Sequence, residues 1–140
     1  MRLSKLLLST AISTAIALSF LVEEAAAKGK VNLYCSAQED WCQLMAKGFE
    51  KASGIKVNMT RRSSGETFAK IKAEARNPKG DVWWGGTGDP HLQAAEEGLS
   101  TPYTSPNQAQ LQGWAVAQSD SAGGNTIGIY SGALGYGYNE

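Results

Sequence analysis

The chain has 140 residues, and its thirteen Lys and Arg residues balance thirteen Asp and Glu residues, so its formal net charge is zero. No overall basic excess is present to neutralise nucleic-acid phosphates, and 42% apolar residues are too many for a disordered protein. The length allows one globular domain or a part of a larger protein.

The first 27 residues have the layout of a secretory signal peptide. Arg2 and Lys5 precede an apolar stretch over residues 6–22, and three alanines end the segment at Ala27. A basic start, an apolar middle and small residues at the end predict cleavage after Ala27 and export. A retained membrane anchor is the alternative, although the apolar stretch is at the short end of the length that spans a bilayer.

Two cysteines follow the predicted cleavage point, and export would place them in an oxidising compartment. The six residues between Cys35 and Cys42 fit neither a Cys-x-x-Cys redox motif nor a zinc-binding spacing. A structural disulfide is favoured over two buried thiols. The only histidine, His91, lies far along the chain, so no Cys–His catalytic pair is indicated.

The first predicted strand and helix occupy residues 31–54. Apolar and polar residues alternate over residues 31–35, which predicts a strand. Ser36 and Glu39 form a Ser-x-x-Glu pattern, which predicts a capping box at the start of a helix that Gly54 ends. Helical spacing predicts that this helix buries Trp41, Met45, Phe49 and Ala52.

The same order of elements repeats twice. Residues 55–59 predict a second strand, and Ser63 and Glu66 predict a second capping box. The helix that follows is predicted to bury Phe68, Ile71 and Ala75 and to end before Pro78.

The third repeat is shorter. Residues 81–84 predict an apolar strand, and residues 85–88 predict a tight glycine loop. Asp89 is the expected N-cap of a short helix, with Pro90 at its first position, and the helix is expected to run to Gly98.

The remainder of the chain is less regular. Residues 101–113 predict a loop with one short helix, residues 114–117 a strand, and residues 120–125 a turn-rich connection. Residues 126–139 predict a long glycine-rich strand. Its tyrosines are interpreted as packing residues, with ligand contact as the alternative.

Strands that alternate with helices predict right-handed crossovers and a parallel sheet. The carboxyl ends of parallel strands share one edge, so the loops at residues 36–38, 62–65 and 85–88 are expected to meet there. Each loop leads into a helix N-terminus, which favours an anion. Helix capping alone is the alternative role for Ser36, Ser63 and Asp89. The candidate ligand-binding residues from these loops are Ser36, Ala37, Gln38, Arg62, Ser63, Ser64, Gly65, Gly85, Gly86 and Thr87.

Basic residues concentrate over residues 56–79, and no Lys or Arg follows Asp81. The favoured interpretation is a solvated basic helix face. The alternative is that Arg61 and Arg62 lie near an anion site.

Several segments resemble one known family. The sequences VNLYCSAQ (31–38), FEKASGIKV (49–57), SSGE (63–66), GDVWWGG (80–86) and AAEEGL (94–99) are similar to periplasmic solute-binding proteins of ABC importers, in the branch called iron(III)-type or extracellular solute-binding family 1. The resemblance implies an α/β, type II periplasmic-binding-protein-like fold, with a mainly parallel sheet flanked by helices. Because family members have two lobes, it also implies that residues 28–140 are the first lobe, truncated near the hinge, with the second lobe absent.

The resemblance further implies a binding protein in the periplasm and not an enzyme. Its expected partners are a small-molecule solute and the importer's permease at the inner membrane, with no nucleic acid and no cofactor, and a monomer is expected. A small secreted hydrolase that uses His91 is the alternative from a different functional class.

The ligand class follows from the loops and from the resemblance together. Iron-binding relatives often have a histidine where Gln38 stands, whereas Glu66 matches their glutamate after the second strand, so Glu66 joins the candidate binding residues. Small residues at helix starts favour a phosphorylated or phosphonate anion, while ferric iron is the alternative ligand. Trp41, Trp83 and Trp84 are candidates for stacking on an organic part of the ligand, although core packing is favoured for Trp83.

Overall fold

A computed structural model describes residues 29–132, 135 and 137 of the chain. The predicted signal peptide, residues 1–27, lies outside the described residues. Within the residues that are described, no helix is long and apolar enough to cross a membrane.

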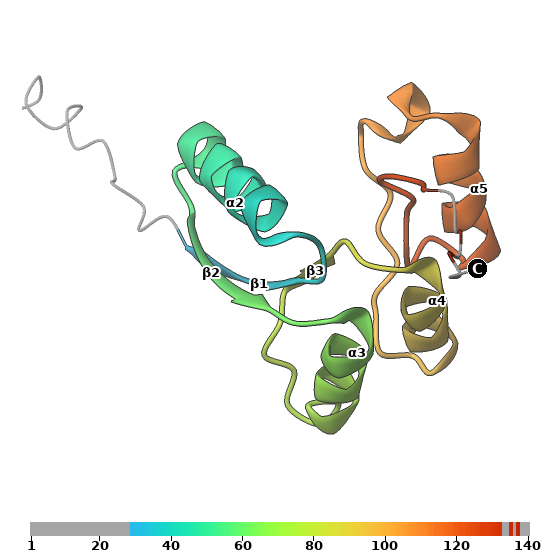
Figure 1. Cartoon of the computed structure of the whole chain (residues 1–140), viewed down its shortest axis with the longest axis horizontal. Helices are drawn as coiled ribbons and strands as arrows, with labels where there is room; N and C mark the ends of the chain where they lie inside the picture. The colour runs from blue at the N-terminus through green and yellow to red at the C-terminus, as the bar shows by residue number, and fades with distance from the viewer. Residues whose placement is uncertain (1–28, 133–134, 136, 138–140) are drawn as a thin grey trace, which may run out of the picture.

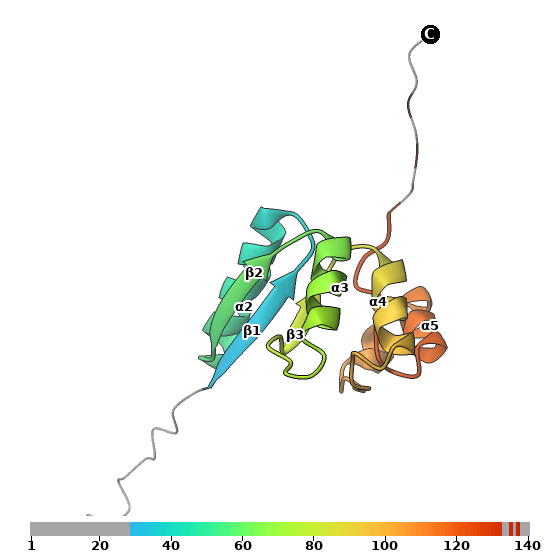
Figure 2. The same ribbon diagram turned by 90° about the horizontal axis from the view of Figure 1, so that it is seen from below.

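Three parallel strands alternate with helices, as the sequence predicted. The elements are β1 (Lys30–Cys35), α2 (Glu39–Ser53), β2 (Lys56–Arg61), α3 (Ser64–Ala73), β3 (Val82–Trp84), α4 (Gly88–Glu96), the 3₁₀ turn η1 (Gln108–Gln110) and α5 (Gly113–Ser121). The strands lie in the order β2-β1-β3. Helix α2 covers one face of the sheet and α3 the other (Figures 1 and 2), with α4 beside α3 and α5 farther out.

The main core cluster lies where β1 meets α2. It contains Leu33, Cys35, Ala37 and Cys42, and Trp84 packs against it from β3. Cys35 and Cys42 form a disulfide and are fully buried, so the predicted bridge is present. The bridge attaches the first turn of α2 to the carboxyl end of β1.

The predicted buried face of α2 is wrong. Trp41, Met45 and Phe49 are between 44% and 46% exposed, and Ala52 is exposed as well. Cys42 faces the sheet instead because its disulfide partner lies on β1. Successive residues on a helix point about 100° apart, so Trp41 and Ala52 lie about 80–100° from the direction of Cys42. The inward orientation of Cys42 therefore accounts for the exposure of Trp41 and Ala52, but not for that of Phe49, which lies on nearly the same side of the helix as Cys42.

Two of the three predicted N-caps are also wrong. Helix α2 starts after Gln38, and Ser36 lies before it in the loop. Helix α4 starts after Thr87, which places Asp89 in its first turn. The third cap is confirmed, since the Ser63 hydroxyl accepts from the Glu66 amide and the Glu66 carboxylate accepts from the Ser63 amide.

The face of α3 matches its prediction in part. Phe68 and Ile71 are half-buried, and the fully buried side chain is that of Thr67. Ala75 is exposed because the helix has already ended at Ala73. The polar Thr67 was not identified from apolar spacing.

The two later strand predictions are wrong over the described residues. Residues 114–117 lie in α5, because a four-residue apolar run fits a partly buried helix as well as a strand. Residues 126–132 form no strand. Strand β3 is the edge of the sheet, and a cavity of about 600 Å³ separates it from residues 124–127, which therefore have no strand to pair with. The rest of that prediction, apart from residues 135 and 137, lies outside the described residues.

Candidate ligand-binding rim

Three loops meet at the carboxyl edge of the sheet, and we call residues 36–38, 62–66 and 85–87 the rim. The amide of Ser36 donates to the Trp84 carbonyl at 2.9 Å, which joins the first loop to the end of β3. The amide of Arg62 donates to the Cys35 carbonyl at 3.1 Å. The amide of Thr87 donates to Ser64 Oγ at 3.1 Å, which joins the third loop to the start of α3. The structure therefore brings together the loops that the sequence predicted to meet.

Two glycines allow this close approach. Gly85 and Gly86 have φ angles of 78° and 97°, a backbone conformation that favours glycine. A Cβ on Gly86 would overlap Ser64 Oγ and lie 2.9 Å from Ser36 Cβ. A Cβ on Gly85 would lie 2.9 Å from Ala37 Cβ. Both positions of the third loop thus require glycine for the other two loops to pack against it.

Ser63 and Glu66 are occupied by helix capping. The Glu66 carboxylate accepts from the Ser63 hydroxyl at 2.7 Å and from the Ser63 amide at 3.0 Å. Both bonds lower the pKa of Glu66, and the bond from the Ser63 hydroxyl has the larger effect. Ser63 therefore has the capping role that was its alternative, whereas Ser36 and Asp89 are not the cap residues of their helices.

Ser36 belongs to a hydrogen-bond network beneath the rim. Its hydroxyl accepts from Trp83 Nε1 at 2.9 Å and lies 3.1 Å from Thr67 Oγ1. The Trp83 ring stacks on His91 at 3.7 Å between centroids, and His91 Nε2 donates to the Gly85 carbonyl at 2.9 Å. Burial lowers the pKa of His91, although the bond to Gly85 partly opposes this shift. Trp83 thus has a packing role, as the sequence favoured.

Positive charge lies beside the first two loops. Arg61 Nε donates to the Ala37 carbonyl at 2.7 Å and lies 3.8 Å from the Glu39 carboxylate. Arg62 is exposed next to the N-terminus of α3, and Gln38 is exposed at the N-terminus of α2. Arg61 and Arg62 therefore lie beside the rim, and the alternative that they lie near an anion site stays a prediction.

Tyr130 contacts the rim, although it was not among the candidate binding residues predicted from the three loops. The Tyr130 hydroxyl accepts from the Gly86 amide at 2.7 Å, and its ring meets Trp41 edge-on at 5.8 Å between centroids. Tyr130 lies 44 residues from Gly86, so no local spacing links the two. The tyrosine-rich composition of residues 126–139 was the available indication.

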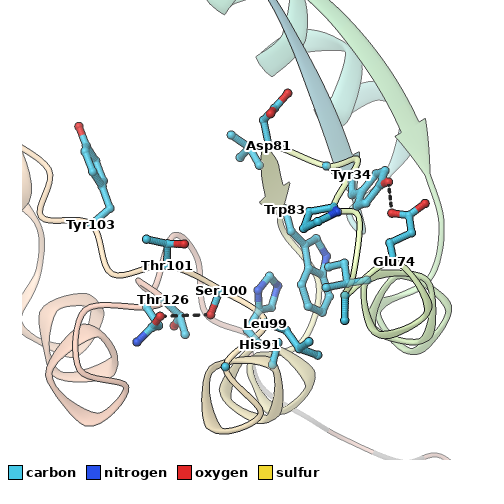
Figure 3. A pocket seen from close by; sticks show the side chains of 18 of the residues that line it. Tyr34, Glu74, Asp81, Trp83, His91, Leu99, Ser100, Thr101, Tyr103 and Thr126 are labelled. Carbon is cyan, nitrogen blue, oxygen red and sulfur yellow. Dashed lines mark hydrogen bonds between the residues drawn. The ribbon is translucent and has the colours of Figure 1, made fainter.

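A cavity of about 600 Å³ lies beside β3, outside the rim (Figure 3). No rim residue lines it. The Tyr34 hydroxyl donates to Glu74 at 2.6 Å, and Lys70 forms a 2.6 Å ion pair with the same carboxylate. The cavity borders the unpaired edge of β3, and these polar groups are bonded to each other. The rim, where helix N-termini gather, is therefore the stronger candidate site. Among the described residues, no group of three or more Asp, Glu, His or Cys side chains is placed to hold a metal ion.

Comparison with known proteins identifies relatives of this chain. The sequence profile of the family described as "Bacterial extracellular solute-binding protein" matches residues 21–125, a range that includes the whole rim. An uncharacterized protein of Haemophilus influenzae is 40% identical over 134 residues. That alignment covers 94% of this chain and 39% of the relative, so the chain spans well under half of that protein.

Solved structures show the same fold. The periplasmic binding protein AfuA from Actinobacillus pleuropneumoniae, described with exogenous fructose-6-phosphate bound, is 48% identical with a TM-score of 0.61, over 62% of this chain and 27% of AfuA. The periplasmic binding protein P5PA is 35% identical with a TM-score of 0.64, over 69% of this chain and 31% of P5PA. Iron-bound HitA from Pseudomonas aeruginosa, at 24% identity and a TM-score of 0.56, covers 61% of this chain and 28% of HitA and supports the fold alone.

The family profile matches well over half of the chain, and the parallel sheet flanked by helices is the one found in the similar structures. The predicted type II periplasmic-binding-protein-like fold is therefore confirmed. The chain belongs to the bacterial extracellular solute-binding protein family, and its described residues have the fold of part of a first lobe.

Proposed function

We propose that this chain supplies the first lobe of a periplasmic receptor that captures a phosphorylated or phosphonate solute and delivers it to the permease of an ABC importer. The observation that carries the proposal is the meeting of three helix N-termini at one rim. The fructose-6-phosphate described in AfuA, at 48% identity, supports the same ligand class.

The rim suits the oxygens of a phosphate group. Amides in the first turn of a helix have no acceptor within the helix, and in α3 these include Ser64 and Gly65. Helix dipoles add positive potential at the same points. The guanidinium of Arg62, exposed beside the start of α3, can form charge-assisted hydrogen bonds with a phosphate oxygen.

The proposed activity is binding without catalysis. A hydrolase would need a nucleophile within reach of a base. His91 stacks on Trp83 and bonds to the Gly85 carbonyl, and no hydroxyl among the described residues is hydrogen-bonded to its ring. The Ser36 hydroxyl is held by Trp83 and Thr67 instead.

Thermal denaturation of the full chain with a ligand panel tests the proposal. The panel contains fructose 6-phosphate, fructose, inorganic phosphate, aminoethylphosphonate and ferric citrate. Fructose 6-phosphate should raise the melting temperature with increasing concentration, as expected for a ligand that binds only the folded state, and fructose should not. A shift with ferric citrate alone would contradict the anion proposal and favour ferric transport.

A matched pair of arginine variants locates the bound anion. Arg62→Gln removes a charge at the rim, and Arg76→Gln removes the same charge beyond the end of α3. We expect the first variant to reduce the shift with fructose 6-phosphate and the second to leave it unchanged. Release of inorganic phosphate in the same samples, lost in His91→Ala, would instead support the hydrolase alternative.

A further inference from the structure

The Tyr130 hydroxyl is already hydrogen-bonded to one of the rim amides. It accepts a hydrogen bond from the Gly86 amide at 2.7 Å and donates to the Gly86 carbonyl at 3.2 Å. Gly86 lies at the centre of the rim, against Ser36 and Ser64. An anion seated on the three helix N-termini would compete with this hydroxyl for the same N–H group.

The segment that carries Tyr130 is lightly attached. Gly128 is fixed to α5 by a bond from its amide to the Ala115 carbonyl. Beyond it, the Tyr130 hydroxyl makes the only hydrogen bonds from residues 129–132 to the rest of the described chain. The rings of Tyr130 and Trp41 also meet edge-on, and residues 129–132 are all exposed. Loss of the hydroxyl bond would therefore free residues 129–132 without disturbing the sheet.

A phosphate oxygen is a stronger acceptor than a tyrosine hydroxyl. Hydrogen bonds to an ionised acceptor are about twice as strong as neutral ones. Both Gly86 groups keep a hydrogen-bond partner when the phosphate replaces the Tyr130 hydroxyl. The Gly86 amide donates to a phosphate oxygen, and the Gly86 carbonyl accepts from water.

On the basis of the proposed function, we propose that Tyr130 is a latch: its hydroxyl holds the Gly86 amide in the unliganded lobe, and a ligand phosphate displaces it. Ligand binding then releases residues 129–132 from the rim. Occupancy of the site is thereby coupled to the position of residues 129–132, which follow α5 in the chain.

The latch has a distinctive signature in binding data. Tyr130→Phe keeps the ring against Trp41 but removes the hydroxyl that competes with the ligand. Because the competing contact is of the order of one or two neutral hydrogen bonds, the variant should bind fructose 6-phosphate about 2- to 10-fold more tightly. A residue with a merely structural role would change stability and leave the affinity unaltered. Tyr103→Phe is the matched control, since Tyr103 is exposed and outside the rim.

Titration of the full chain and both variants with fructose 6-phosphate, followed by calorimetry and tryptophan fluorescence, decides the question. In the wild type we also expect a ligand-induced fluorescence change that Trp41→Phe abolishes, because Tyr130 leaves the Trp41 ring. Unchanged affinity in Tyr130→Phe overturns the latch. Weaker binding overturns it too and makes Tyr130 a ligand contact. A wild type that binds neither fructose 6-phosphate nor inorganic phosphate overturns the proposed function and the latch together.

Discussion

Trp83 donates its indole N–H to Ser36 Oγ at 2.9 Å and so joins β3 to the loop that follows β1. The same hydroxyl lies 3.1 Å from Thr67 Oγ1, which is 1% exposed on α3. One serine therefore connects all three strand–helix units beneath the rim. This inward role explains why Ser36 does not cap α2, although the Ser-x-x-Glu pattern fits a capping box.

Ser36→Ala should weaken the lobe. The substitution leaves Trp83 Nε1 and Thr67 Oγ1 without their shared partner, and an unsatisfied buried polar group costs about 1–3 kcal/mol. Urea denaturation should show a free energy of unfolding lower by that amount. Ser121→Ala, at an exposed position on α5, is the control and should stay close to the wild type. Equal unfolding midpoints for both variants would contradict the network.

Two glycine substitutions should have opposite effects on stability. Gly86→Ala adds a side chain to a residue whose φ is 97° and places its Cβ against Ser64. The free energy of unfolding should fall by about 1–3 kcal/mol. Gly48→Ala lies within α2 with nothing within 4 Å of the added Cβ, and should stabilise by about 0.5–1 kcal/mol. Thermal melts of both variants check the signs, and a stable Gly86→Ala would show that the loops do not need their close approach.

Local patterns predicted the elements whose causes are local. Alternating residues identified β1 and β2, and the capping box at Ser63 and Glu66 identified the start of α3. The rule that parallel strands share one carboxyl edge then located the rim loops without any knowledge of contacts.

The failures come from distant partners. The buried residue of α2 is Cys42, which is joined by a disulfide to β1 and which the apolar spacing that begins at Trp41 did not identify. Residues 126–132 have strand-like composition, but a strand exists only beside another strand, and the described sheet ends at β3. The bond between Tyr130 and Gly86 likewise depends on how the chain returns to the rim, which no spacing in the sequence specifies.

Removal of the disulfide should destabilise the lobe and disturb the first rim loop. Cys35 and Cys42 are separated by seven positions, and the ring that they close contains residues 36–38. The Cys35→Ala, Cys42→Ala double variant should lose about 2–3 kcal/mol, the chain-entropy estimate for so short a ring. Urea denaturation of the wild type with and without reductant measures the same loss. The double variant is the control, since its own stability should not respond to reductant.

His91 should make the stability of the lobe fall in mild acid. Burial lowers the pKa of His91 below its ordinary value of 6.5, so the unfolded chain takes up a proton at a higher pH than the folded chain. The stabilising contribution is therefore complete above about pH 6.5, declines as the pH falls towards the folded-state pKa, and is fully lost below it. His91 is the only histidine, which makes the effect assignable.

Urea denaturation between about pH 7.5 and pH 5.5 covers this window, which lies above the ordinary carboxylate range. His91→Gln keeps a donor for the Gly85 carbonyl but cannot titrate, so its free energy of unfolding should vary less with pH than that of the wild type. The lowered pKa values of Glu66 and Glu74 place their own losses at more acidic pH, where both proteins should respond alike. An identical slope in the two proteins over the upper window would show that His91 is not held neutral against Trp83.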